Sequence, residues 1–528
     1  MKSKIIFAFL FLFSTYVRLN AQVSNEGQPK SWELRNTKQI SPIILPSFNE
    51  RAIQIEDEVN DRSMSIPYRF GYKFEVNYNL ENSGTWETLP NGDRIWRIRF
   101  LSDGAKSLNF ILEDFFIPFG ANLFLYNNEK TDLLGAYNFT QNNKNKTLGT
   151  WLVKGEDIIL EYFEPASQAG KGSFTVKNIT HGYRSGNLNA SNDCNFDVNC
   201  SIGSDADPLK DIVKKSVALI LVNGASMCSG ALINNTAKDK KPYFLTANHC
   251  YSDPATWAFK FNWISTNTIC GTTEDSISNT DHHTISGATL KAKNYTTDFC
   301  LVEINSEIPA EWETVWSGWD RSDVAASWVF GIHHPAGDIM KVLRDSNPLP
   351  TGFMWTIENL EKGSAQNGSS GSPLYNNYGR IVGQLCCGEP FCQGTVSQNE
   401  FFRYGKFDFS WNAGNAASTR LRDWLDPINS GVTFLDSYPI STMNTSENPS
   451  TQIKVYPNPS KDIFTIDLQN SNTDINYELI SMNGSLIRKG IFKSKINTID
   501  LSTKPNGIYI LKLMKEKATT STIKLSKQ

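Results

Sequence analysis

Cysteine is missing from both ends of this chain. All nine cysteines lie between Cys194 and Cys392, in a chain of 528 residues. Disulfide cross-linking is therefore confined to a central part, and the flanking parts must fold on ordinary hydrophobic cores. The odd number leaves at least one thiol unpaired or paired outside the chain.

Strong charge of either sign and long apolar runs are also missing. The net charge is −3, which excludes the basic composition expected of a nucleic-acid-binding protein. One short apolar run, residues 5–13, follows Lys2 and Lys4 and precedes a small-residue cleavage site at residues 19–21. That run is too short to span a bilayer. We expect residues 1–21 to be a secretory signal peptide, the product to be secreted, and no transmembrane anchor.

The sequence pattern instead favours β-strands and turns, and the length of the chain indicates several domains. Residues 22–190 alternate apolar and polar residues in short runs such as residues 94–100, separated by turn signals such as residues 90–93. We predict a β-rich pro-region with a chaperoning or inhibitory role; a plain accessory domain is the alternative. Residues 180–193 are polar and resemble a processing linker.

The rest of the chain predicts two further β domains, which makes the fold class all-β. Residues 191–437 carry many short strand-like runs, typical of a barrel or sandwich of antiparallel sheet, with one helix expected at residues 416–425. Residues 438–451 have the Ser, Thr, Asn and Pro composition of a linker. Residues 452–528 alternate again and predict a small β domain without catalytic chemistry.

The stretch with the clearest chemistry reads QNGSSGS over residues 366–372. A serine hydroxyl attacks a carbonyl only when a base removes its proton, and backbone N–H groups must stabilise the resulting oxyanion. Gly368 can adopt a conformation that turns its N–H inward beside that of Ser370. A flexible linker is the alternative reading of this stretch alone.

A base and an orienting acid are available elsewhere in the central domain. His249 follows an apolar run at residues 243–246, and Asp298 opens the apolar strand at residues 299–304. A buried carboxylate that accepts the imidazole Nδ1–H would orient such a base. Taken singly, each is more often a structural histidine or a turn aspartate. Together with Ser370 on one cysteine-bearing β domain, they predict a catalytic triad.

The central unit that carries these residues resembles chymotrypsin-fold serine proteases, and among these it resembles the bacterial lysyl endopeptidases. The matching stretches are CNFDVNC (194–200), CSGALINNT (228–236), FLTANHC (244–250), WSGWDR (316–321), IHHP (332–335), GSSGSP (368–373), GQL (383–385) and DWLDP (423–427). The resemblance implies a double β-barrel, with His249 as general base, Asp298 orienting it and Ser370 as nucleophile. It also implies an oxyanion hole formed by the amides of Gly368 and Ser370.

The resemblance implies a disulfide framework as well. It pairs Cys194 with Cys392, Cys200 with Cys270, and Cys228 with Cys250. Three cysteines fall outside this framework: Cys300, Cys386 and Cys387. The last two would lie on the strand that lines the substrate backbone, where an adjacent-pair disulfide, a bond to Cys300 or a free thiol all stay open.

Two positions depart from the related proteases. Ser369 stands where most trypsin-like enzymes have an aspartate that pairs with a freed amino terminus, so we expect maturation to follow removal of residues 22–190. Phe402 stands where the lysyl enzymes have their lysine-binding aspartate. Glu400 or Asp408 would be the substitute carboxylate; equally, the pocket for the residue before the cleaved bond (P1) would be apolar.

The remaining histidines and the two ends complete the sequence evidence. We interpret His333 and His334 as structural, and His282 and His283 as part of a polar loop in which a metal site is the less favoured alternative. Residues 22–190 resemble the pro-region of the same proteases. The stretches KVYPNP (454–459), LISMNG (479–484) and PNGIYIL (505–511) resemble the C-terminal sorting domain of type IX secretion in Bacteroidetes.

We therefore predict a secreted serine endopeptidase that works through an acyl-enzyme, with lysine as the first candidate for P1. The alternatives are an endopeptidase with another P1 preference, and a non-catalytic surface-binding protein on a protease fold. We expect protein or peptide substrates, and export through the periplasm and outer membrane by the type IX machinery. We expect no nucleic-acid partner, no metal, no cofactor and a monomer.

Overall fold

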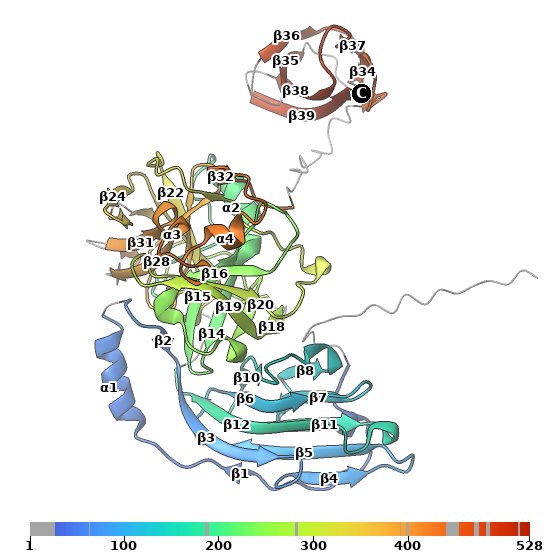
Figure 1. The fold of residues 1–528 in the computed structure, drawn as a ribbon, viewed down its shortest axis with the longest axis vertical. Coiled ribbons are helices and arrows are strands. Elements are labelled where there is room, and N and C mark those ends of the chain that lie inside the picture. Colours follow the sequence, from blue (N-terminus) through green and yellow to red (C-terminus); the bar gives the residue numbers. More distant parts are fainter. Residues whose placement is uncertain are drawn as a thin grey trace, which may run out of the picture. The chain divides into compact units, whose positions relative to one another are not determined.

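The computed structural model divides the chain into two compact units, which meet in sequence at residues 439 and 440. The described residues are 27–62, 64–184, 190–279, 283–358, 360–390, 392–397, 401–439, 454–468, 475–481, 486–515 and 518–527. Figure 1 shows the strands and helices of both units, and each unit is described by itself. The predictions of a signal peptide and of the 438–451 linker fall almost wholly outside the described residues.

The amino-terminal part of the first unit consists of two β-sheets (Figure 1). The first has the order β1-β5-β11-β7-β8 with β4 on β5, and the second the order β10-β6-β12-β3 with β9 on β6. Their bounds are β1 Ile43–Ile44, β3 Gly71–Asn79, β4 Thr85–Thr88, β5 Arg94–Leu101, β6 Ser107–Phe116, β7 Asn122–Asn127, β8 Leu133–Tyr137, β9 Leu148–Gly149, β10 Val153–Lys154, β11 Asp157–Glu164 and β12 Ser173–Gly182. The alternating runs bury one large cluster that includes Trp96, Phe110, Leu160 and Ile179.

The central part contains an eight-stranded and an eleven-stranded sheet, which are the two barrels of a chymotrypsin-like fold. The first has the order β18-β17-β14-β15-β16-β20-β19, with β2 of the amino-terminal part added to β15. Its bounds are β2 Tyr68–Arg69, β14 Val217–Val222, β15 Ser226–Leu232, β16 Tyr243–Ala247, β17 Ala258–Phe261, β18 Thr284–Ser286, β19 Ala288–Asn294 and β20 Phe299–Ile304. The all-β prediction and the double barrel are confirmed.

The second barrel follows the path β13-β23-β22-β27-β28-β31-β25-β24, with β26 on β23 and β21 joining β28 to β32. Its bounds are β13 Phe196–Asp197, β21 Trp319–Asp320, β22 Val329–His333, β23 Lys341–Asp345, β24 Leu349–Thr351, β25 Met354–Ile357, β26 Leu360–Lys362, β27 Pro373–Asn376, β28 Ile381–Glu389, β31 Phe401–Lys406 and β32 Phe434–Leu435. The short ribbon β29 Cys392–Gln393 and β30 Val396–Ser397 stands apart.

Helices in the first unit are few and short. The α-helices are α1 Glu50–Asn60, α2 Asp207–Val213, α3 Phe407–Trp411 and α4 Arg422–Leu425. The 3-10 turns are η1 Lys30–Glu33, η2 Phe139–Gln141, η3 Ala166–Gln168, η4 Lys214–Ser216, η5 Asn248–Cys250, η6 Pro254–Thr256, η7 Ala310–Trp312, η8 Pro335–Gly337 and η9 Ala417–Thr419. Asn49 caps α1 by accepting the N–H of Ala52.

The single helix predicted at residues 416–425 is wrong. The chain makes η9, passes through Arg420 in an extended conformation (φ −146°, ψ 158°), and then forms α4. The N–H of Leu421 bonds to the carbonyl of Ser410 in α3 instead of continuing a helix. Because Leu421 is then fully buried, tertiary packing overrides the local helical pattern.

The second unit is a small β-sandwich with its own core, and this part of the fold prediction is also confirmed. One sheet has the order β33-β34-β37 and the other β36-β35-β38-β39. The bounds are β33 Lys454–Tyr456, β34 Ile463–Asp467, β35 Ile475–Ser481, β36 Leu486–Phe492, β37 Ile496–Asp500, β38 Gly507–Lys515 and β39 Ala518–Lys527. Its core includes Phe464, Tyr477, Leu479 and Leu511.

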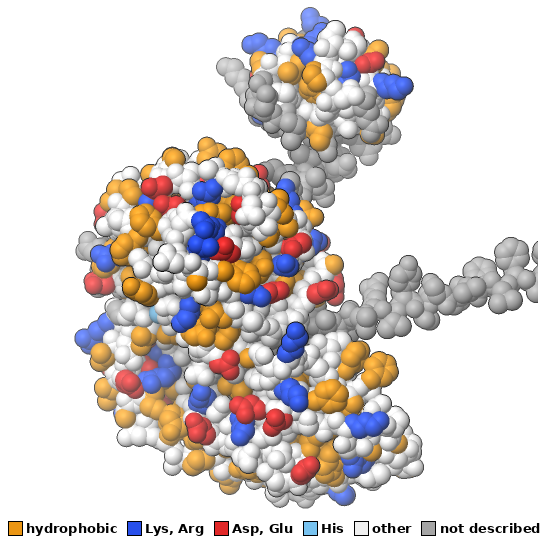
Figure 2. All heavy atoms as spheres, in the orientation of Figure 1, with side chains coloured by type: hydrophobic (Ala, Val, Ile, Leu, Met, Phe, Trp, Pro, Cys, Tyr) orange, Lys and Arg blue, Asp and Glu red, His pale blue; other side chains and the backbone are white. Residues whose placement is uncertain are grey.

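The surface carries no field of a single sign on the face shown in Figure 2, where lysine and arginine side chains are interspersed with aspartate and glutamate. This mixture agrees with the net charge of −3. Among the described residues, no helix has the length and apolar character that crossing a membrane requires.

Candidate active site

Two neighbouring strands of the first barrel bring His249 and Asp298 together. β16 and β20 are antiparallel, with Ala247 opposite Phe299. His249 comes two residues after the end of β16, and Asp298 comes one residue before the start of β20. The two side chains therefore emerge at the same edge of the sheet although 49 residues separate them in sequence.

The contact between these two residues orients the imidazole. The Nδ1 atom of His249 lies 2.6 Å from Oδ2 of Asp298, and the backbone N–H of His249 donates to Oδ1 at 2.9 Å. Asp298 is 7% exposed, so both donors compensate a carboxylate that has lost most of its water. With a proton on Nδ1, the lone pair of Nε2 is left free to act as a base.

The loop that carries Ser370 is held between the two barrels. The carbonyl of Ser370 accepts the N–H of Ser229 in β15, and the N–H of Gly371 donates to Leu385 in β28, each at 2.8 Å. Ser370 is fully buried. The nucleophile predicted from sequence thus stands at the junction of the two sheets, beside the His249 turn.

Gly368 has a backbone conformation that favours glycine. Its φ is +96°, and a Cβ there would lie 2.8 Å from the N atom of Ala336. The carbonyl of the preceding residue, Asn367, accepts the N–H of Ala336 at 2.6 Å. Because N–H and C=O of a trans peptide point in opposite directions, the Gly368 N–H faces away from Ala336.

Three disulfides are present: Cys194–Cys392, Cys200–Cys270 and Cys228–Cys250. They are the pairs that the family resemblance implies. Cys228–Cys250 ties β15 to the turn of His249. Among the described residues, the one group of histidine and cysteine ligand atoms close enough for a metal is Cys228, His249 and Cys250, and its two sulfurs are consumed in this disulfide.

The other three cysteines are thiols in this structure. Cys300 is fully buried in β20, and burial raises the pKa of its thiol. The thiol of Cys386 donates to the sulfur of Cys387 across 2.9 Å, on strand β28. Of the alternatives left open by the sequence, the geometry therefore favours contact between Cys386 and Cys387 over a bond to Cys300.

Ser369, which stands where most trypsin-like enzymes have the aspartate, contacts a buried histidine. The Nδ1 atom of His333 lies 2.7 Å from Oγ of Ser369, directly before the nucleophile. Burial, as the largest cause, lowers the pKa of His333 to about 3 and that of His334 to about 4. Both imidazoles are therefore neutral at neutral pH, and the loop is held without a buried charge.

These two histidines predict acid sensitivity. Their folded-state pKa values lie below the unfolded value of about 6.5, so the unfolded chain binds protons first as the pH falls. The two neutral imidazoles make their full contribution to the free energy of unfolding above pH ~6.5. This contribution declines as the pH falls toward about 3, and at pH ~5 it is smaller by about 2 kcal/mol per histidine. Urea unfolding of the first unit between pH 7 and pH 5 measures it. The variant His333→Gln should show a shallower decline, and an unchanged stability in the wild-type protein would contradict the expectation.

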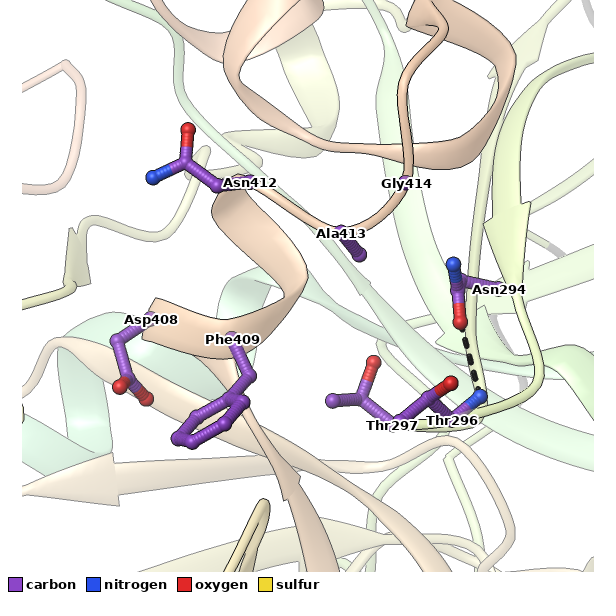
Figure 3. A pocket seen from close by; sticks show the side chains of 8 residues that line it. All are labelled: Asn294, Thr296, Thr297, Asp408, Phe409, Asn412, Ala413 and Gly414. Atoms are coloured by element: carbon purple, nitrogen blue, oxygen red, sulfur yellow. Dashed lines mark hydrogen bonds between the residues drawn. The ribbon is translucent and has the colours of Figure 1, made fainter.

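The residues proposed for P1 recognition are not grouped. Phe402 is fully buried in an apolar cluster, whereas Glu400 lies outside the described residues. Asp408 lies on α3 and lines a pocket of about 460 Å³ that Phe402 does not line. Figure 3 shows the residues that line this pocket. The Asp408 carboxylate is 3.9 Å from Nζ of Lys406, and burial raises its pKa. Asp408 is therefore not part of the cluster around Phe402.

One residue of the site was missed by sequence reasoning. The hydroxyl of Ser370 donates to the carbonyl of Met64, in the amino-terminal part of the chain, at 3.4 Å. Nε2 of His249 has no hydrogen-bond partner among the described residues. The Ser370 hydroxyl is thus turned toward Met64 and makes no hydrogen bond to the imidazole of His249. No motif marks Met64 in the sequence.

Two parts of the chain are similar in sequence to known proteins. The family model described as "Lysyl endopeptidase, C-terminal domain" matches residues 188–403, and the one described as "Secretion system C-terminal sorting domain" matches residues 454–528. The lysyl endopeptidase of Pseudomonas aeruginosa is 26% identical over 358 residues, which are 60% of this chain and 74% of that protein.

Solved structures of similar proteins include an inactive serine-to-alanine mutant of Rv3671c from M. tuberculosis and Deg5. Rv3671c is 12% identical with a TM-score of 0.26, covering 39% of this chain and 89% of its own. Deg5 is 14% identical with a TM-score of 0.24, covering 38% and 87% respectively.

The class of protein follows: the central domain is a serine protease domain of the chymotrypsin fold, and the chain is a serine endopeptidase. In particular, it resembles the bacterial lysyl endopeptidases and ends in a sorting domain of type IX secretion. That sorting domain engages the type IX machinery, which exports the protein to the cell surface or the medium.

Proposed function

We propose that the protein hydrolyses peptide bonds through an acyl-enzyme formed on Ser370. The observation that carries the proposal is the 2.6 Å contact between His249 and Asp298 beside the buried serine. Nε2 of His249 removes the hydroxyl proton as Oγ attacks the substrate carbonyl, and then returns it to the leaving amine. Asp298 keeps the proton on Nδ1 and stabilises the imidazolium.

The oxyanion that forms in this attack needs fixed donors. The amide of Gly368 faces away from Ala336, and we assign it together with the amide of Ser370 to this role. A pair of such donors acts in a site shielded from water, where each typically contributes about 3 kcal/mol to transition-state stabilisation. Hydrolysis of the ester by water then restores Ser370.

The P1 preference fits an endopeptidase with an apolar pocket better than one that selects lysine. Lysine preference rests on resemblance alone, whereas Phe402, in place of the lysine-binding aspartate, is fully buried in an apolar cluster. Its substrates are proteins or peptides, and the active form is a monomer from which residues 22–190 have been removed. Residues 191–437 are the protease domain and residues 452–528 the exported sorting domain. Cys386 and Cys387 lie on β28, along the expected path of the substrate backbone.

A serine-reactive phosphonate tests the proposed chemistry. Processed protein should gain one phosphonyl group, mapped by mass spectrometry to Ser370. The variant His249→Gln should react far more slowly because the hydroxyl loses its base. The matched control is His283→Gln, because the ring of His283 stacks on Trp312. This variant should react like wild type. A processed wild-type protein with no label on Ser370 would refute the proposal and favour a non-catalytic binding protein.

A further inference from the structure

The segment around Met64 crosses the site between the two barrels. After it, Tyr68 of β2 pairs antiparallel with Met227 of β15, which adds a strand to the first barrel. At its other end, the N–H of Met64 donates to the carbonyl of Gly388 in β28 at 3.4 Å. Since β15 and β28 flank the Ser370 loop, the segment runs across Ser370 from one barrel to the other.

Met64 stands where a substrate would present its P1 residue. An extended substrate binds such a cleft by backbone pairing, and its scissile carbonyl meets the serine hydroxyl. Of the described residues, Met64 supplies the carbonyl that accepts the hydrogen bond of Ser370 Oγ. The pocket that holds the side chain of Met64 therefore corresponds to the P1 pocket.

The side chain of Met64 is fully buried. It belongs to an apolar cluster of the second barrel that also contains Trp355, Leu385, Phe402 and Tyr404. The cluster includes Phe402 at the position where lysyl enzymes place their aspartate. An unbranched thioether side chain suits such an irregular apolar space, because it is flexible and needs no hydrogen bond.

A lysine side chain would need a carboxylate in the same space. Among the described residues, Asp345 at the end of β23 is a buried carboxylate close enough to Tyr404 of this cluster to add to burial, the largest cause, in raising the pKa of that tyrosine. Asp345 already accepts the N–H of Asn347 at 2.7 Å. A buried ammonium without a partner of its own is strongly disfavoured, so the apolar occupant is the better match.

We propose that Met64 occupies the P1 pocket of its own chain, and that this pocket selects a methionine or leucine side chain in substrates. The inference rests on the proposed serine endopeptidase function and adds its substrate class. Met64 is not cleaved in this arrangement because the Ser370 hydroxyl donates to its carbonyl while Nε2 of His249 is unpartnered. The same contact keeps the unprocessed enzyme inactive.

The segment is held in place by charges of the amino-terminal part. Nε of Arg69 donates to Asp57 at 2.8 Å, and the hydroxyl of Tyr183 donates to the other oxygen of Asp57 at 2.6 Å. Arg184 also pairs with Asp61, just before the segment. Because all of these residues lie within the predicted pro-region, its removal takes away both the occupant and its anchors.

Cleavage of a mixed peptide library by processed enzyme tests the pocket. The active-site concentration is first titrated with the phosphonate, so a failure of the proposed chemistry shows as absent labelling and is separate from the P1 result. Unlabelled enzyme from a preparation that titrates as active should cleave after methionine and leucine at least ~10-fold faster than after lysine, a difference typical of a pocket that strands a charge. Preference for lysine or arginine would overturn the proposal. Loss of that preference in Asp345→Asn would assign the Asp345 carboxylate to P1 recognition.

A second measurement tests the seat of Met64 itself. In the unprocessed chain, Met64→Asp should raise the rate of phosphonate labelling at Ser370 at least ~10-fold, because a carboxylate leaves the apolar pocket. Met64→Leu should stay as slow as wild type. The matched control is Ile66→Asp, since Ile66 is 41% exposed and a charge there disturbs no pocket. Equal labelling rates for Met64→Asp and wild type would contradict the placement of Met64.

Discussion

Replacing Ser370 by alanine is expected to lower kcat for peptide hydrolysis by about 10⁶-fold, the loss typical of a nucleophile that acts as one unit with its base. The physical reason is that Ser370 lies beside the turn of His249, whose imidazole is oriented by Asp298 to act as the base. KM should change little, because the hydroxyl contributes to the transition state and hardly to ground-state binding. Single-turnover kinetics on processed protein measure both quantities.

A neighbouring serine supplies the control for this result. Ser372 is also fully buried in the same loop, and Ser372→Ala removes one hydroxyl of the same kind without touching the nucleophile. It should retain the wild-type kcat within a few-fold. If Ser370→Ala kept more than about a hundredth of the wild-type activity, another group would be the nucleophile and the assignment would be wrong.

The variant Asp298→Asn is expected to cost about 10⁴-fold in kcat, as the same change does in other triads. The amide would offer an N–H to Nδ1 of His249, which shifts the proton to Nε2 and removes the lone pair that acts as base. The geometry of the turn should survive, because the remaining amide oxygen still accepts the backbone N–H of His249. The pH dependence of kcat on processed protein shows whether the loss is one of proton transfer.

An exposed aspartate serves as the matched control for Asp298. Asp275→Asn changes the same charge by the same substitution at a solvent-exposed position of the protease domain. It should leave kcat unchanged. A loss of less than ~10-fold in Asp298→Asn would mean that His249 is oriented by something else.

Much of the catalytic geometry follows from local sequence patterns. The apolar runs at β16 and β20 predict strands, and polar residues placed directly at strand ends lie at a sheet edge. His249 and Asp298 are such residues, and β16 and β20 are neighbours in the sheet. The glycine on each side of the two serines at 369 and 370 likewise indicates a tight loop. These features were predictable because each depends on a few consecutive residues.

Contacts between distant parts of the chain were not predictable in this way. Nothing near Met64 distinguishes it from a surface loop residue, and its position depends on β2 pairing with β15 more than 150 residues later. The helix expected at residues 416–425 failed for a similar reason, because Leu421 packs beside α3 instead of following its local pattern. Packing across the fold decides both cases.

The position of Phe402 shows the limit of reasoning by resemblance. Similarity to the lysyl enzymes identified the position, and the phenylalanine there left two possibilities open: a substitute carboxylate elsewhere or an apolar P1 pocket. The structure buries Phe402 in the apolar cluster that also receives Met64. Because a pocket is formed by side chains from several strands, its chemistry follows from the fold rather than from one aligned residue.

The most direct test of the central claim is a crystal structure of processed protein without residues 22–190. We expect Nε2 of His249 to lie within about 2.6–3.2 Å of Oγ of Ser370, once the Met64 carbonyl no longer takes the hydroxyl hydrogen bond. The contact between Nδ1 and Asp298 should persist. Side chains of residues 249, 298 and 370 that point into separate regions of the domain would contradict the account.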